Sequence, residues 1–276
     1  MAFLYSFVAI ILVFVVVWCL LLLPNRQKRD WSPLMGYRYA HRGLHDKEKG
    51  IPENSMTAFR AAVDHGFGAE LDVHLLADGN LAVFHDGSLK RVCGADVCIE
   101  DLTAADLAKY PLQGTEEHIP LLADVLAVFE GKTPLIIELK VERGNAAALT
   151  DATVEALRSW KGTYCMESFH PAAVYHLKKH HPQVIRGQLS QNFMKGSETS
   201  PLSPPLAFVM THLLTTALTR PDFIAYKHTD RREVSLRLMK KLYAVREVSW
   251  TIRGEEELYR LEKEGCIPIF ENFIPA

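Results

Sequence analysis

From Tyr37 to the C-terminus, short apolar runs alternate with stretches of helical periodicity, and this alternation limits the possible folds more than any other feature. Nine runs have the length and residue types of strands. The strands are predicted at Tyr37–Ala40, Ala69–His74, Leu81–Phe84, Pro134–Leu139, Tyr164–Phe169, Val184–Leu189, Phe223–Tyr226, Val248–Thr251 and Ile267–Phe270. The helices are predicted at Ser55–His65, Leu121–Phe129, Ala146–Trp160, Pro171–His180, Leu206–Leu218, Arg232–Tyr243 and Glu255–Lys263.

The second and third strands differ from the others because only the turn sequence Ala77-Asp78-Gly79-Asn80 lies between them. Parallel pairing needs a long connection, so these two strands are predicted to form an antiparallel hairpin. Without the return strand of the hairpin, eight strands remain, most of them separated by a helix. About 250 residues suit one large barrel or two smaller domains, and the alternation favours an α/β fold of the (β/α)₈ barrel type.

Two stretches are longer or more polar than the connections of a barrel require. Gly87–Pro120 is predicted to be a small insertion, at about residues 87–120, with a short helix near Thr103–Tyr110. Asn192–Pro205 is rich in polar residues, glycine and proline and is predicted to be a loop.

The N-terminal segment is apolar enough to cross a membrane. Ala2–Leu23 is a run of 22 residues without a charged side chain, and a helix of that length, about 33 Å, crosses the hydrocarbon core. A secretory signal peptide is the alternative, but the basic start and small-residue cleavage site of such peptides are lacking. Residues 1–24 are therefore predicted to be a transmembrane anchor.

A basic linker, residues 25–36, follows the anchor and precedes the barrel domain at residues 37–276. Arg26, Lys28 and Arg29 lie directly after the apolar segment, and no charged side chain precedes it. Because positively charged flanks stay in the cytoplasm, the barrel is predicted to be cytoplasmic and the protein to be a single-pass cell-membrane protein.

Composition and cysteine placement exclude some classes of function. The formal net charge is −2, so no overall positive field favours nucleic acid as a partner. The five cysteines are scattered and form no zinc-binding pattern, which favours free thiols. A disulfide between Cys93 and Cys98 is the less favoured alternative.

Acids, bases and cations gather where the predicted strands end, which is where barrels carry their functional groups. They are His41, Arg42, Glu70, Asp72, His85, Asp86, Glu138, Lys140, Glu167, Gln188, Lys227, Trp250 and Glu271. A single polar residue at a strand end can be inert, but so many at one mouth indicate a site.

Three carboxylates in this set are candidates for binding a metal ion. Glu70 and Asp72 are two residues apart on one strand, so their side chains share a face. Buried together they need a neutralising cation, and Glu138 can add a third carboxylate. Oxygen ligands of this kind suit Mg²⁺ or Ca²⁺. A salt-bridge network with Lys140 and Arg42 explains the spacing equally well.

The remaining candidates supply proton transfer and positive charge. His41 and His85 follow predicted strands, and because histidine as a residue type suits proton transfer near neutral pH, they are candidate acid and base. Arg42 and Lys140 can contact a phosphate. Glu53 and Asn54 lie before the first helix, which Asn54 can cap.

These residues resemble the signature of the glycerophosphodiester phosphodiesterase family. The resemblance extends from about Tyr37 to the C-terminus. It rests on His41-Arg42-Gly43, Pro52-Glu53-Asn54-Ser55, Ala58-Phe59, Glu70-Leu71-Asp72-Val73, Asp78-Gly79, His85-Asp86, Ile137-Glu138-Leu139-Lys140, Ser168-Phe169 and Trp250-Thr251. Each short motif is weak, but the combination is highly specific.

The resemblance implies a barrel of the phospholipase C-like type that hydrolyses glycerophosphodiesters to glycerol 3-phosphate and an alcohol. It implies that His41 and His85 are the acid/base pair, that Arg42 and Lys140 contact phosphate, and that Glu53 supports the site. The metal ligands would be Glu70, Asp72 and Glu138. Apart from these implied roles, Asn54 and Trp250 are further supporting candidates, and packing in the core explains Trp250 equally well.

The sequence departs from the family pattern at two places and leaves two other functions open. Ser55 replaces the usual threonine, and Glu271 lies where aspartate is more common, so its role is undefined. The anchor allows a lysophospholipid as the substrate in place of a soluble diester. A membrane-bound headgroup-binding protein without catalysis is the less favoured alternative, because every expected acid, base and cation is present.

Overall fold

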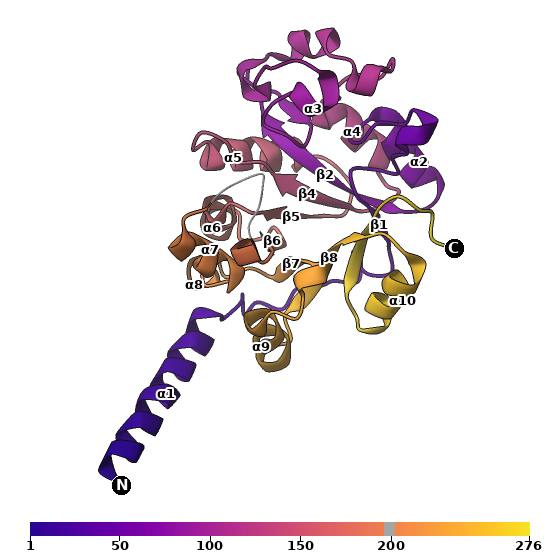
Figure 1. The fold of residues 1–276 in the computed structure, drawn as a ribbon. Coiled ribbons are helices and arrows are strands. Elements are labelled where there is room, and N and C mark those ends of the chain that lie inside the picture. The colour runs from indigo at the N-terminus through magenta and orange to yellow at the C-terminus, as the bar shows by residue number, and fades with distance from the viewer. Residues whose placement is uncertain (196–201) are drawn as a thin grey trace.

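A closed barrel of eight parallel strands forms the centre of the computed structural model, which describes residues 1–195 and 202–276 (Figure 1). The strands are β1 Tyr39–Ala40, β2 Gly68–Leu75, β4 Leu135–Leu139, β5 Tyr164–Ser168, β6 Arg186–Ser190, β7 Phe223–Lys227, β8 Arg246–Ile252 and β9 Ile267–Phe270. β1 pairs in parallel with both β2 and β9 and so closes the sheet. The predicted barrel is confirmed. Residues 196–201 of the predicted loop Asn192–Pro205 lie outside the described residues.

The predicted antiparallel hairpin is also confirmed. β3, at Leu81–Val83, pairs antiparallel with β2, and Val73 lies opposite Val83. Gly79 has a φ of +84° in the connecting turn, a conformation that glycine adopts without steric cost. Because β3 is an added strand, it leaves the eight-strand order of the barrel unchanged.

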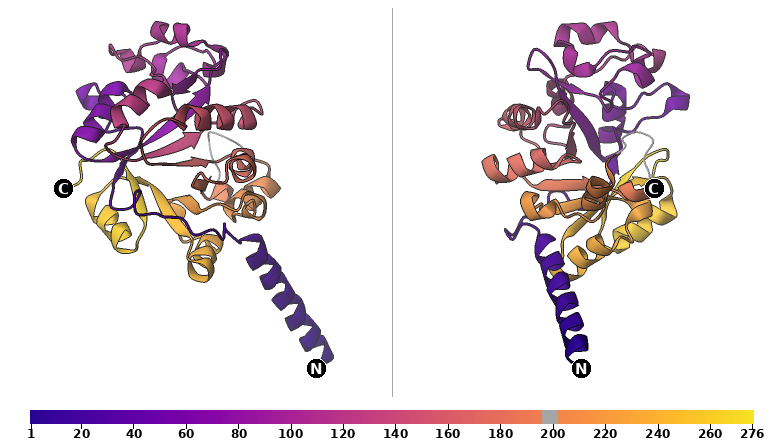
Figure 2. Two further views of the ribbon diagram at one scale, coloured as in Figure 1. Left: turned by 180° about the vertical axis from the view of Figure 1, so that it is seen from behind. Right: turned by 60° about the vertical axis from the view of Figure 1, so that its left-hand side comes forward.

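Helices surround the barrel in the order expected from the alternation (Figures 1 and 2). They are α2 Met56–Asp64, α4 Leu122–Phe129, α5 Ala146–Leu157, α6 Pro171–His180, α7 Pro204–Thr211, α8 Thr216–Thr219, α9 Val234–Tyr243 and α10 Glu255–Lys263. The prediction of one continuous helix at Leu206–Leu218 is wrong. Leu213 has a φ of +58° and breaks the helix, and Tyr226 donates a hydrogen bond to the Thr211 carbonyl at the break.

The connection from β3 to α4 packs around an apolar cluster of its own. It contains α3 Lys90–Cys93, η2 Ile99–Asp101, η3 Ala104–Lys109 and η4 Leu112–Gly114, where η denotes a 3₁₀ turn. The helix predicted near Thr103–Tyr110 is therefore a 3₁₀ turn. Leu89, Val92 and Leu112 belong to the buried cluster beneath these turns. Cys93 and Cys98 are free thiols.

Apolar side chains close the barrel at the N-terminal ends of its strands. Tyr39, Phe223 and Ile267 pack there against Leu34 of the N-terminal linker. The Tyr39 hydroxyl donates a 2.8 Å hydrogen bond to the Leu34 carbonyl. With this end filled, the polar residues at the opposite ends of the strands form the open mouth of the barrel.

An apolar helix, α1 at Ala2–Leu21, projects from the side of the barrel (Figures 1 and 2). Its segment Phe3–Leu21, 19 residues long, has the length and composition to cross a membrane, and a signal sequence can share both properties. The end of α1 is packed on the barrel. The Trp18 indole donates a hydrogen bond to Ser235, and Leu22 is fully buried.

Asp222 holds the linker after α1 against the barrel through hydrogen bonds. This buried carboxylate accepts hydrogen bonds from Asn25 (2.6 Å), from Arg29 (2.9 Å) and from the Arg186 backbone N–H (3.0 Å). Asp222→Ala is expected to lower the free energy of unfolding by about 3 kcal/mol, because it leaves buried partners uncompensated. Urea denaturation of the detergent-solubilised full chain measures this loss.

A matched control for that prediction is Glu262→Ala. Glu262 also pairs with an arginine, Arg38, which lies just after the linker, at 2.8 Å, but this pair is more exposed to solvent. Exposed pairs contribute at most about 1 kcal/mol. Equal losses in the two variants would show that Asp222 does not have the special role assigned to it.

Candidate active site

Three buried carboxylates meet at the mouth of the barrel. Glu70 and Asp72 lie on β2, and Asp72 is opposite Glu138 of β4 in the parallel register. One oxygen from each lies within 4.8 Å of those from the other two. No side chain of the three is exposed by more than 9%. Burial of three acids at such distances demands compensation by positive charge.

Two of the three carboxylates have cationic or amide partners. Lys140 Nζ lies 3.0 Å from Asp72 Oδ1 and 2.8 Å from Glu138 Oε1. Asn54 donates a 2.8 Å hydrogen bond to Asp72 Oδ2. Burial opposes ionisation of Asp72, but Lys140, His85 and Arg42 lower its pKa well below its ordinary value. Burial raises the pKa of Glu138 despite the adjacent Lys140.

Glu70 is the carboxylate that this network does not neutralise. It accepts a 3.1 Å hydrogen bond from the Arg42 backbone N–H, and His41 Nε2 is 3.9 Å from it. Among the described residues, no lysine or arginine side chain forms an ion pair with it. Burial, then Asp72 and Glu138, raises its pKa well above the ordinary value. A salt-bridge network alone therefore leaves Glu70 without a positively charged partner. A divalent cation bound by the three carboxylates would supply one.

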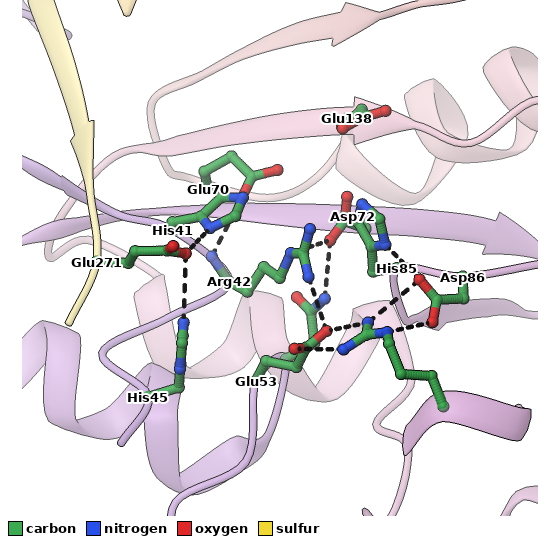
Figure 3. Close-up of polar contacts among 12 residues, drawn as sticks. His41, Arg42, His45, Glu53, Glu70, Asp72, His85, Asp86, Glu138 and Glu271 are labelled. Carbon is green, nitrogen blue, oxygen red and sulfur yellow. Dashed lines mark hydrogen bonds and ion pairs between the residues drawn. The ribbon is translucent and has the colours of Figure 1, made fainter. Parts of the chain in front are cut away.

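His41 is oriented by a carboxylate directly after the last strand (Figure 3). Its Nδ1 lies 2.5 Å from Glu271 Oε2, and its Nε2 points toward Glu70. Arg253 donates a 2.8 Å hydrogen bond to the other oxygen of Glu271. Burial lowers the pKa of His41 to about 4, although Glu271 opposes this shift.

His85 is held in the same manner on the other side of the carboxylates (Figure 3). Its Nδ1 lies 2.6 Å from Asp86 Oδ1. Asp86 and Glu53 both accept hydrogen bonds from Arg91, at 2.6 Å for the closest contact of each. Glu53 also accepts a 2.8 Å hydrogen bond from Arg42. These contacts join the two sides of the mouth into one charged network.

The turn after β1 brings Arg42 into this network. Arg42 has a φ of +54°, which costs a non-glycine residue roughly 1–3 kcal/mol and is typical of functional sites. Gly43 follows with a φ of +78°, and a Cβ there would lie 2.9 Å from that of Ala58. Only glycine fits between this turn and α2.

A cavity of about 270 Å³ opens above the carboxylates. One wall is apolar and contains Phe169, Leu189 and Trp250, with the Phe169 and Trp250 rings in edge-to-face contact at 5.6 Å. Glu167 and Lys227 also line it. Burial, then Glu138, raises the pKa of Glu167 well above its ordinary value.

All ten residues predicted for the site lie at this mouth, in two layers. Six line the cavity: His41, Arg42, Glu70, His85, Glu138 and Trp250. Four lie behind them: Glu53, Asn54, Asp72 and Lys140. Lys140 is in contact with Asp72 and Glu138, and its predicted contact with phosphate stays a prediction.

Sequence reasoning missed the residues that hold the histidines. Asp86 and Glu271 lie at predicted strand ends but have no role assigned from the sequence, and each forms a hydrogen bond with a histidine. No sequence pattern indicates a role for Arg91. It lies in the connection after β3, and only the folded path of that connection brings it to the mouth. Arg253 likewise follows β8 as an ordinary exposed cation in the sequence.

Comparison with known proteins gives a family model and several relatives. The model described as "Glycerophosphoryl diester phosphodiesterase family" matches residues 41–276. The glycerophosphodiester phosphodiesterase of Caldanaerobacter subterraneus is 29% identical over 162 residues, 55% of this chain and 65% of the relative. Lysophospholipase D GDPD1 of Rattus norvegicus is 36% identical over 40% of this chain and 38% of the relative. The chain thus spans less than two thirds of either relative.

Solved structures share the fold over most of the chain. A phosphodiesterase of Oleispira antarctica, in complex with the product sn-glycerol-3-phosphate, has a TM-score of 0.69 at 23% identity, covering 88% of this chain and 95% of the other. The glycerophosphodiester phosphodiesterase of Thermotoga maritima has a TM-score of 0.63 at 24% identity, covering 84% and 92%. At these identities the likeness establishes the barrel fold alone.

Proposed function

Since the chain belongs to the glycerophosphoryl diester phosphodiesterase family, whose members are phosphoric diester hydrolases, we propose that it hydrolyses glycerophosphodiesters to glycerol 3-phosphate and an alcohol. The observation that carries this proposal is the arrangement at the mouth. A trio of buried carboxylates, one of them uncompensated, lies between two histidines that are each oriented by an acid.

Glu70, Asp72 and Glu138 are proposed to hold a divalent cation, Mg²⁺ or Ca²⁺, both of which prefer oxygen ligands. When bound, such a cation stabilises negative charge on the phosphoryl oxygens and lowers the pKa of the attacking hydroxyl. Lys140 and Asn54 then serve to fix the carboxylates in place, since both contact Asp72.

The two histidines are proposed to move the protons. In each ring Nδ1 faces a carboxylate, so Nε2 is the atom left for proton transfer at the cavity. One histidine takes a proton from the attacking hydroxyl and the other gives a proton to the leaving alcohol. When water attacks, glycerol 3-phosphate forms directly. When the glycerol 2-hydroxyl attacks, a cyclic phosphodiester forms first, and water then opens it to glycerol 3-phosphate. Arg42 is proposed to bind a phosphate oxygen, which is supported by its position in the lining of the cavity.

Release of glycerol 3-phosphate from glycerophosphocholine by the solubilised full-length chain tests the proposal. EDTA is expected to lower the rate at least about 100-fold, because the charge of the metal contributes several kcal/mol to the transition state. Excess Mg²⁺ or Ca²⁺ is expected to restore the rate. A rate that EDTA leaves unchanged would contradict the metal site, and no product with any ion would contradict the reaction.

We also propose that α1 is a membrane anchor and that the barrel is cytoplasmic. Leu22 is buried in the same cluster as Ile224 and Leu236, an attachment that favours a retained helix over a cleaved one. The cytoplasmic orientation rests on Arg26, Lys28 and Arg29, which follow the apolar helix. Protease treatment of sealed right-side-out vesicles tests the orientation. A cytoplasmic barrel is expected to be protected from the protease.

A lysophospholipid is the second candidate substrate. The apolar wall of Phe169, Leu189 and Trp250 beside the carboxylates favours it, since a soluble diester has no acyl chain to pack there. A curated relative is named lysophospholipase D. Rates on glycerophosphocholine and on micellar lysophosphatidylcholine, measured with the same preparation, distinguish the two.

A further inference from the structure

Exposed apolar side chains are concentrated where α1 leaves the barrel. Eight large hydrophobic side chains that follow α1 in the chain are exposed among the described residues, and five of them lie on α7, α8 and α9. These five are Leu206, Phe208, Leu218, Val234 and Leu242. α1 is in contact with all three helices, and Figure 1 shows it leaving beside α8 and α9.

The path of α1 places the membrane on the side of the mouth. The Asn25 backbone N–H donates a hydrogen bond to the carbonyl of Pro221. Pro221 precedes β7 and therefore lies at the closed end of the barrel. Trp18, in contrast, contacts Ser235 in the first turn of α9, which follows the other end of β7. Followed backward from Asn25, the chain therefore rises along the barrel wall toward the mouth. The rest of α1 continues outward from there.

Leu206, Phe208 and Val234 lie on this mouth side of the barrel. The Phe208 ring is in edge-to-face contact with the Trp18 ring at 5.9 Å, and tryptophan near a helix end is typical of the membrane interface. Val234, the first residue of α9, is 59% exposed. A bilayer that holds α1 would cover these side chains without any movement of the barrel.

Cations interleave with the apolar residues on α9. A groove of about 1010 Å³ runs along this helix, and Arg232, Arg237 and Lys241 line it. Within the described residues none of these three has an ion-pair or side-chain hydrogen-bond partner, whereas Arg231 and Lys240 are paired with Glu247. His228 and Thr229 line both this groove and the active-site cavity. Unpaired cations beside apolar side chains complement an anionic lipid surface.

We infer that Leu206, Phe208, Val234, Arg232, Arg237 and Lys241 form a docking surface for the anionic lipid bilayer that holds α1. The surface fixes the barrel with its mouth close to the headgroups. This inference rests on the anchor proposed above and adds a second, peripheral contact to it. The docking surface lies outside the catalytic site, so the first of its two tests does not depend on turnover.

The first test places a tryptophan reporter on the docking surface. Full-length chain carrying Val234→Trp, and a control carrying Lys132→Trp, are reconstituted into nanodiscs that contain anionic lipid with or without brominated acyl chains. Lys132 is exposed and lies on the connection before β4, at the closed end of the barrel. Brominated lipid is expected to quench the added fluorescence of Val234→Trp at least about twice as strongly as that of Lys132→Trp. Equal quenching overturns the docking surface, and a chain that fails to enter nanodiscs overturns the anchor with it.

The second test reverses charge. Arg237→Glu/Lys241→Glu is compared with Lys132→Glu/Lys161→Glu, the same change in exposed lysines before β4 and β5. In vesicles with anionic lipid, the rate on lysophosphatidylcholine relative to glycerophosphocholine is expected to fall about tenfold in the first variant only. An unchanged ratio overturns the proposed role of the two cations. Absence of activity on both substrates in the parent chain rejects the proposed hydrolysis, and the quenching test then still decides the docking surface.

Discussion

Replacing Glu70 with glutamine is expected to lower turnover at least about a thousandfold, because it removes one carboxylate ligand from the proposed metal site. The same change is expected to leave the metal-free protein at least as stable as the parent. Glu70 has no ion-pair partner among the described side chains of lysine and arginine, and burial with Asp72 and Glu138 raises its pKa well above the ordinary value. A neutral amide removes this repulsion.

The pH dependence of stability follows from the direction of that shift. An acid whose pKa is raised by folding costs no stability below its unfolded pKa, and the cost grows as pH rises from the unfolded to the folded value. The metal-free parent is therefore expected to lose stability above about pH 4.5, the ordinary value for glutamate. Glu70→Gln removes this contribution. Thermal unfolding of both proteins in EDTA, from pH 4 to 8, measures the difference.

Asp72→Asn gives the contrasting result that makes the comparison decisive. Asp72 is paired with Lys140 and lies 3.6 Å from Arg42, and its pKa is lowered. Its loss removes one of the two carboxylate partners of Lys140 and of Arg42, which keep only Glu138 and Glu53, so the metal-free protein is expected to lose about 3 kcal/mol of stability. Both variants are expected to lose the rise in Tm that Mg²⁺ or Ca²⁺ gives the parent. A normal metal response in Glu70→Gln would remove Glu70 from the site.

The strands and the ten site residues could be predicted because their signals are local. Glu70 and Asp72 are adjacent on one face of a strand by alternation alone, and the turn at Gly79 identified the hairpin. The barrel then brings all strand ends to one mouth, so residues far apart in the sequence meet without any pairwise information. His41 and His85 were candidates on this ground before their partners were known.

The partners of those histidines could not be predicted, because they depend on three-dimensional placement. Glu271 follows β9, and closure of the barrel through β1 and β9 brings it to His41. Arg91 reaches Glu53 only because the segment after β3 folds over the mouth. The break at Leu213 was missed for a related reason. A side chain buried in the core and a hydrogen bond from Tyr226 favour a turn where the local sequence favours a helix.

His41→Ala and His85→Ala are each expected to lower turnover at least about 100-fold, because each removes a proton-transfer group. The metal-dependent rise in Tm is expected to remain in both variants, because the proposed metal ligands are Glu70, Asp72 and Glu138 and both variants keep them. Steady-state release of glycerol 3-phosphate at saturating metal measures the loss. A variant with near-normal turnover would exclude that histidine from the mechanism.

Glu271→Gln tests how His41 is held. Glutamine can still contact His41 Nδ1. It lacks the negative charge of the carboxylate, which both His41 and Arg253 contact in the parent chain. Its turnover is expected to fall between that of the parent and that of His41→Ala. In a His41→Ala background the same change should then cost little more, because residues that act as a unit are not additive. Full additivity of the two losses would mean that Glu271 acts on the reaction independently of His41.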